Sequence, residues 1–159
     1  MAGVGNLLRG DDGFGVEVVR RLLADALPSS VEVMETGISG LSLVQKLFEG
    51  YDALIVVDTV DRGGAPGTVY LLEPQVPDAT SLSQEELDAL LGSSCAIEPS
   101  RALILAKALG VLPERVLVVG CQPQNCDELD RGLTEPVLKA VEAALQYVRG
   151  AIDKLREGP

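Results

Sequence analysis

The chain has 159 residues, the size of one domain that can bury an ordinary hydrophobic core. Apolar residues make up 47% of the chain and aromatic residues only 3%, so this is the composition of a globular protein with an aliphatic core, not of a disordered chain. The formal charge of −11 argues against binding to nucleic acid or to anionic membranes, and it makes a basic peptide or protein surface the natural partner.

The cysteine and histidine content limits the available chemistry. The three cysteines, Cys95, Cys121 and Cys126, have no C-x-x-C spacing, which argues against a disulfide framework and a cysteine-based zinc site. The chain contains no histidine, so the commonest general base and metal ligand is missing. No segment resembles a signal peptide, and the apolar runs are far shorter than the roughly 20 residues that cross a bilayer. We expect a cytoplasmic protein and treat it as a monomer.

The first part of the chain predicts a short strand, a glycine-rich loop and a helix. Only Met1 and Ala2 precede Gly3, so we expect the first strand to be short. The loop runs from Gly5 to Gly15 and contains the sequence GDDGFG. Apolar residues then recur at helical spacing, which predicts an amphipathic helix that ends at Pro28. The apolar positions of this helix are Val18, Val19, Leu22, Leu23 and Ala26.

The middle of the chain contains the clearest strand signal. A strand over 31–35 and a helix over 41–48 come first. The segment ALIVV, residues 53–57, is an uninterrupted apolar run that ends at Asp58. Such a run is typical of a strand covered on both faces, so we expect a central parallel strand here. Residues 68–72 predict a further strand, which the preceding turn-rich sequence DRGGAPG would make antiparallel.

The second half of the chain predicts three helices and one strand. A helix over 83–91 opens with a capping-box pattern, and a helix over 98–109 has a proline in its first turn. The segment 116–119 predicts a strand, and Thr134 is placed to cap the last helix. Strands that alternate with helices predict a single α/β domain over 1–159, with three α/β/α layers and a mainly parallel sheet.

Acidic side chains come at the ends of two predicted strands. Asp11 and Asp12 lie in the first loop, and Asp58 directly follows the ALIVV run. Ligands of parallel sheets bind beyond the carboxyl ends of the strands, so these carboxylates would be neighbours if the two strands are adjacent. A cation suits such a group. The alternatives are purely structural roles: Asp11 and Asp12 would cap the following helix and complement its dipole, and Asp58 would be an ordinary turn residue.

Two further features allow more than one interpretation. The glycine-rich loop could hold a nucleotide phosphate, but its spacing is not G-x-G-x-x-G and its two aspartates would repel a pyrophosphate. Cys95 lies just before the helix that begins near Glu98, where it would be either a small buried residue or a thiolate ligand or nucleophile. We expect Cys121 and Cys126 to be structural.

The order of motifs resembles that of the [NiFe]-hydrogenase maturation endopeptidases. The two specific matches are GVGNLLRGDDGFG and ALIVVDTV. Five weaker matches occur in the same order: GISGLSL, APGTVYLL, EPSRALILAKALG, VLVVGCQP and GLTEPV. The resemblance implies a five-stranded mixed sheet flanked by helices, of the phosphorylase/hydrolase-like kind. It also implies an enzyme that removes the carboxyl-terminal extension of a hydrogenase large-subunit precursor after nickel insertion, with nickel as the recognition element.

The resemblance further implies a set of site residues. Asp12 matches the acidic metal ligand of the first motif, and Asp58 matches the aspartate after the central strand. The third position, a histidine in the family, falls on Cys95, whose thiolate is a soft ligand that suits nickel. The metal would be the nickel of the substrate, with zinc or cadmium as a substitute. We expect metal-assisted hydrolysis with Asp12 or Asp11 as base, and the alternative is a non-catalytic relative that binds a precursor in the presence of nickel.

Overall fold

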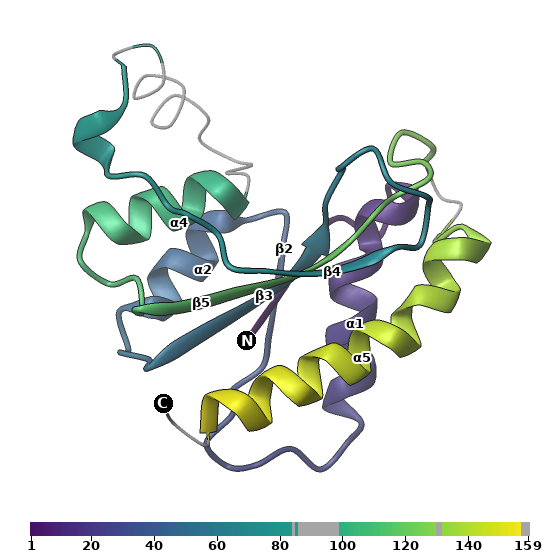
Figure 1. Ribbon diagram of the computed structural model, residues 1–159, viewed down its shortest axis with the longest axis horizontal. Helices are drawn as coiled ribbons and strands as arrows, with labels where there is room; N and C mark the ends of the chain where they lie inside the picture. The colour runs from purple at the N-terminus through teal and green to yellow at the C-terminus, as the bar shows by residue number, and fades with distance from the viewer. Residues whose placement is uncertain (84, 86–98, 130–131, 157–159) are drawn as a thin grey trace.

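The computed structural model describes residues 1–83, 85, 99–129 and 132–156. Its centre is a five-stranded sheet with the strand order β2-β1-β3-β5-β4 (Figure 1). All neighbouring strands are parallel except β4, which is antiparallel to β5. The predicted mixed, mainly parallel sheet is therefore confirmed. The strands are β1 (Ala2–Val4), β2 (Met34–Gly37), β3 (Ala53–Thr59), β4 (Val69–Leu72) and β5 (Arg115–Cys121).

Helices cover both faces of the sheet. α1 and α5 pack on one face, and α2 and α4 pack on the other (Figure 1). Within the described part of the chain, no helix has both the length and the apolar character needed to cross a bilayer. The predicted helix over 83–91 falls almost wholly outside the described residues. The helices are η1 (Gly10–Gly13), α1 (Phe14–Leu23), α2 (Gly40–Leu47), η2 (Ala79–Ser81), α4 (Pro99–Ala108) and α5 (Glu135–Arg156).

β3 lies at the centre of the sheet, as the ALIVV run predicts. Ile55 and Val57 belong to the core under α1 and α5, whereas Leu54 and Val56 belong to the core under α2 and α4. Successive side chains of a strand point to opposite faces, so a strand buried on both sides must be apolar at every position. β1 and β5 pair with the two edges of β3.

Strand pairing gives three strands ends that differ from those predicted from the local sequence. β2 begins at Met34, not at the predicted residue 31, because its first partner in the short strand β1 is Ala2. β3 and β5 pair over seven residues each, so both are longer than predicted. The pairing ends with Thr59 opposite Cys121, so Asp58 lies inside β3 and does not follow it.

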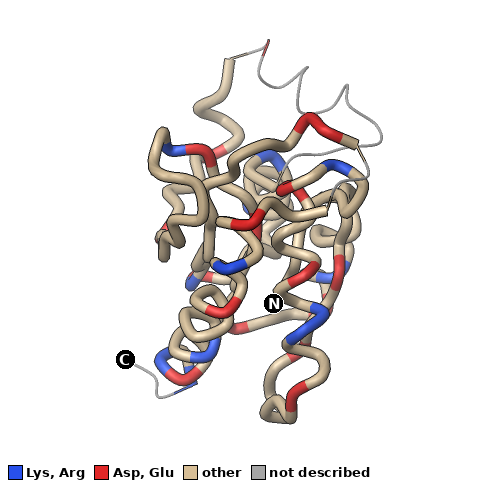
Figure 2. Tube along the Cα trace, turned by 90° about the vertical axis from the view of Figure 1, so that its right-hand side faces the viewer, with Lys and Arg blue, Asp and Glu red and all other residues tan. Residues whose placement is uncertain are grey.

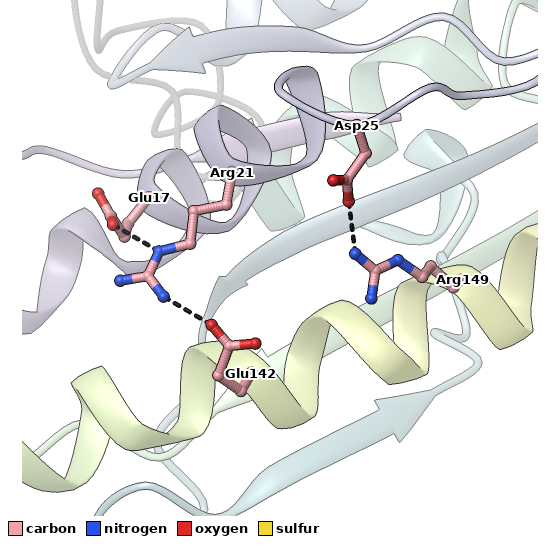
Figure 3. A network of polar contacts seen from close by, with 5 residues as sticks. All are labelled: Glu17, Arg21, Asp25, Glu142 and Arg149. Atoms are coloured by element: carbon pink, nitrogen blue, oxygen red, sulfur yellow. Dashed lines mark hydrogen bonds and ion pairs between the residues drawn. The ribbon is translucent and has the colours of Figure 1, made fainter.

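Ion pairs join α1 to α5 across the outside of the core (Figure 3). Arg21 Nε binds Glu17 Oε1 at 2.9 Å within α1, and Arg21 Nη1 binds Glu142 Oε1 at 2.7 Å on α5. Arg149 of α5 pairs with Asp25, just beyond α1. Acidic and basic positions are interspersed along the trace in Figure 2. Since these pairs are solvent-exposed, they add little to stability compared with the core beneath them.

Candidate functional site

The two acidic motifs come together at the carboxyl edge of the sheet. β1 and β3 are adjacent and parallel, with Gly3 opposite Val57. The loop that carries Asp12 leaves β1 at this edge, and Asp58 is the second-last residue of β3. The adjacency of the two strands, which the sequence argument required, is confirmed.

Glycines allow the first loop to lie directly on the strand ends. Gly5 has a φ of +128°, and a Cβ there would be 1.7 Å from the main-chain oxygen of Asp12. A Cβ on Gly15 would be 2.1 Å from the carbonyl oxygen of Val57 and 2.3 Å from that of Val4. No side chain fits at either position. Close packing therefore explains these glycines without a bound phosphate.

Asp12 is half-buried in the first loop. Its Oδ2 accepts a hydrogen bond of 3.0 Å from the main-chain N–H of Asn6, which fixes the carboxylate near the end of β1. No side-chain hydrogen bond caps η1 or α1. Asp11 and Asp12 therefore do not cap these helices, although both lie in the first turn of η1, where acidic side chains complement the helix dipole.

Asp58 is also half-buried, and its Oδ1 accepts a hydrogen bond of 2.7 Å from the main-chain N–H of Thr59. Its even position in β3 places its side chain on the same face as Leu54 and Val56, the face that α2 and α4 cover. Asp12 enters from the loop before α1, so the two carboxylates reach the edge of the sheet from different elements.

Asp11 has a different environment from its neighbour. It is fully buried, and its Oδ2 accepts hydrogen bonds from the main-chain N–H groups of Gln124 and Asn125 at 2.8 and 2.9 Å. Thr134 donates its main-chain N–H to Oδ1 at 2.7 Å and its hydroxyl to Oδ2 at 3.0 Å. Both oxygens are thus occupied by donors, which favours Asp12 over Asp11 as a proton acceptor.

Cys126, which we expected to be structural, also lies at this edge. Burial first, and then the negative charges of Asp12 and Asp11, raise the pKa of its thiol to about 11, against a hydrogen bond with Thr59 that lowers it. The thiol therefore lies beside the first acidic motif, protonated at neutral pH. Burial likewise raises the pKa of Cys121 to about 12, in keeping with its expected structural role.

Cys95, the predicted third ligand, lies outside the described residues. Among the residues that are described, no group of three or more histidine, cysteine, aspartate or glutamate side chains could hold a metal ion. A metal site at Asp12 and Asp58 stays a prediction, and so does Cys95 as its third ligand.

Comparison with known proteins identifies the family. A model of hydrogenase maturation proteases matches residues 16–151, a span that includes Asp58 but not Asp12. The chain belongs to the hydrogenase maturation protease family.

Individual relatives of this family resemble the chain over nearly its whole length. A putative hydrogenase maturation protease of Methanocaldococcus jannaschii is 34% identical over 157 residues, which cover 97% of this chain and 96% of the relative. The hydrogenase expression/formation protein HoxM of Azotobacter vinelandii is 34% identical over 164 residues, covering 98% of this chain and 75% of HoxM. The hydrogenase maturating endopeptidase HybD from E. coli has a TM-score of 0.74 at 30% identity, covering 96% of this chain and 90% of HybD.

One large cavity of this hydrogenase maturation protease lies away from the acidic edge. It has a volume of about 810 Å³ and lies at the opposite end of the sheet, where Lys107, Arg115 and Lys154 contribute to its lining. Neither Asp12 nor Asp58 lines this cavity. We place the candidate site by its chemistry, since a large substrate protein binds to an open surface and needs no deep pocket.

Proposed function

We propose that the chain is an endopeptidase that removes the carboxyl-terminal extension of a [NiFe]-hydrogenase large-subunit precursor after nickel insertion. The observation that carries this proposal is the placement of Asp12 and Asp58 at one edge of the sheet in a hydrogenase maturation protease, with Asp12 in the loop after β1 and Asp58 in the adjacent parallel strand β3. The nickel ion belongs to the substrate and serves as the recognition element. Asp12, Asp58 and Cys95 would contact it.

The described residues suit metal-assisted hydrolysis. Nickel would position the precursor and polarise the scissile carbonyl or the attacking water. Asp12 then accepts a proton as the water oxygen adds to the carbonyl carbon, and returns it to the leaving amine when the carbon–nitrogen bond breaks. Asp58 holds the cation and balances its charge. Asp11 keeps Gln124, Asn125 and Thr134 against the first motif and does not take part in proton transfer.

The experiment is cleavage of a nickel-loaded precursor, followed by mass spectrometry of the intact large subunit. Asp12→Asn and Asp58→Asn should each abolish cleavage, because each removes a charged ligand while keeping the size of the side chain. Asp153→Asn, an exposed position on α5, is the matched control and should cleave normally. Full activity of either site variant would refute the assigned roles.

The absence of histidine from the chain favours a second candidate, a relative that binds a nickel-loaded precursor without cutting it. Cys95→His separates the two candidates. A gain of cleavage would indicate a degraded enzyme, and a loss of cleavage would indicate a site adapted to thiolate. Stable co-purification with a precursor that is never shortened would support the binding protein.

A further inference from the structure

A single buried side chain fixes the loop that joins β3 to β4. Gln122 follows the last residue of β5 and is only 5% exposed. Its Oε1 accepts hydrogen bonds from the main-chain N–H groups of Arg62 and Gly64 at 2.8 and 3.2 Å. Its Nε2 donates to Oδ1 of Asp61 at 2.8 Å. One amide group thus satisfies three polar groups of the loop, which is why a glutamine is buried here.

Main-chain hydrogen bonds fix both ends of the same loop. Val60 donates its N–H to the carbonyl oxygen of Cys121 at 2.9 Å. At the other end, Gly67 donates to the carbonyl oxygen of Gln122 at 2.9 Å, and Gln122 donates to that of Thr68 at 2.8 Å. The loop therefore has a defined position relative to β5, and so relative to the site.

The first part of the loop, with Val60 and Gly64, lies on the same face of the sheet as Asp58, whereas Gly67 lies against α5. In the strand pairing, Gly120 of β5 is opposite both Asp58 of β3 and Tyr70 of β4. Side chains in one row point to one face, and neighbouring strands are about 4.8 Å apart, so Asp58 and Tyr70 are separated by about 10 Å. Gly120 leaves room between them, and Val60 of the loop occupies it, since a Cβ on Gly120 would be 2.6 Å from Val60 Cγ2.

Arg62 extends from this loop over Tyr70. The carbon at the centre of its guanidinium is 5.7 Å from the centre of the tyrosine ring, a cation–π distance. Gly64 allows the loop to lie against the Tyr70 side chain, because a Cβ on Gly64 would be 2.1 Å from the Tyr70 hydroxyl. Arg62 is exposed, and no ion pair of the described residues includes it. The result is an oriented guanidinium fork whose hydrogen-bonding edge is available to a ligand.

We propose that Arg62 is a specificity-determining residue that binds a carboxylate of the precursor's carboxyl-terminal extension, and that Gln122 positions it. This proposal rests on the proposed function. A planar guanidinium pairs with a carboxylate through two parallel hydrogen bonds, which orient the bound segment as well as hold it. On a protein with a net charge of −11, most of the surface repels a carboxylate, so an oriented guanidinium on the same face of the sheet as Asp58 would decide where the extension lies.

The test is the steady-state kinetics of cleavage of the nickel-loaded precursor by the full chain. Arg62→Gln should raise KM about tenfold and leave kcat nearly unchanged, because it removes a charged contact distant from the scissile bond. Arg62→Lys keeps the positive charge but cannot form two parallel hydrogen bonds. Its KM should lie between that of the unsubstituted protein and that of Arg62→Gln. Gln122→Met, which keeps the volume of the side chain, should raise KM in the same direction. Arg156→Gln at the opposite edge is the matched control and should leave KM unchanged.

Two precursor variants distinguish the sources of the carboxylate. In the first variant, every Asp and Glu of the extension is replaced by Asn or Gln. In the second, a Gly-Ser segment added at the end of the extension moves the terminal carboxylate away from Arg62. The precursor variant that lacks the bound carboxylate should lose its sensitivity to Arg62→Gln. An unchanged KM in Arg62→Gln, with normal cleavage by the unsubstituted protein, would overturn this proposal alone. Absence of cleavage by the unsubstituted protein would overturn the proposed function and this proposal with it.

Discussion

Asp11 and Asp12 show how two neighbouring residues of the same type acquire different roles. Asp11 is fully buried and accepts four hydrogen bonds from Gln124, Asn125 and Thr134. Asp12 is half-buried with one main-chain donor, Asn6. A buried carboxylate surrounded by donors is a structural connection, whereas a partly accessible one remains available to a cation or a proton.

Asp11→Asn should therefore lower stability. The amide keeps one acceptor oxygen and puts an NH₂ group against N–H donors, which leaves buried donors unpaired. We expect the free energy of unfolding to fall by about 2–4 kcal/mol. Urea denaturation measures this change. Asp127→Asn is the control, because the side chain of Asp127 is 96% exposed and its loss should cost less than about 0.5 kcal/mol. Equal effects of the two variants would contradict the role assigned to Asp11.

The thiol of Cys126 reports on the charge of Asp12. Because the Asp12 carboxylate raises the pKa of this thiol, Asp12→Asn should lower that pKa and enlarge the thiolate fraction. Alkylation of Cys126 at mildly alkaline pH should then become a few fold faster. Mass spectrometry of the labelled peptides measures the rate, with Asp153→Asn as the control. An unchanged rate would mean that the two side chains do not interact.

At the scale of elements, apolar patterns were sufficient for most of the fold. The ALIVV run identified the central strand, and the helical spacing after Gly15 identified α1. Strand ends were less well predicted, because pairing partners such as Ala2 for Met34 decide them, and a local pattern contains no information about partners. The position of Cys126 beside Asp12 was not predicted for the same reason, since only the folded loop brings the two residues together.

At the contact between α1 and α5, the contributions of packing and of charge to stability can be measured separately. Leu22 is fully buried in this core, so Leu22→Ala should cost about 2–5 kcal/mol of unfolding free energy. Arg149→Ala removes the exposed ion pair with Asp25 and should cost less than about 1 kcal/mol. Urea denaturation of both variants measures the difference. A larger loss for Arg149→Ala would show that charge, not packing, holds the two helices together.

At the scale of the whole molecule, the acidic surface makes stability depend on pH. A hydrogen bond from Lys46 to Glu32, and one from Lys139 to Glu135, hold the pKa of each carboxyl below its ordinary value. A carboxyl with a lowered pKa in the folded state adds stability above the pKa of the unfolded chain, and this stability is lost as the pH falls through the folded-state value.

The melting temperature should therefore fall as the pH decreases below about 4.5, the ordinary carboxyl pKa. Thermal unfolding over a series of pH values measures this dependence. The double variant Glu32→Gln and Glu135→Gln should show a shallower fall, because neither position can then take up a proton. A dependence identical to that of the unsubstituted protein would contradict the contribution of these two carboxyls.

The missing side chain of Gly15 sets the spacing of the two acidic motifs. Its Cα lies against the carbonyl oxygens of Val4 and Val57, one on each of the two strands that lead to Asp12 and Asp58. Adding one methyl group here would act as a wedge, forcing α1 away from both strands at once. The relative position of Asp12 and Asp58 thus depends on a glycine hydrogen atom in the interior, where any larger group would displace the helix from both strands.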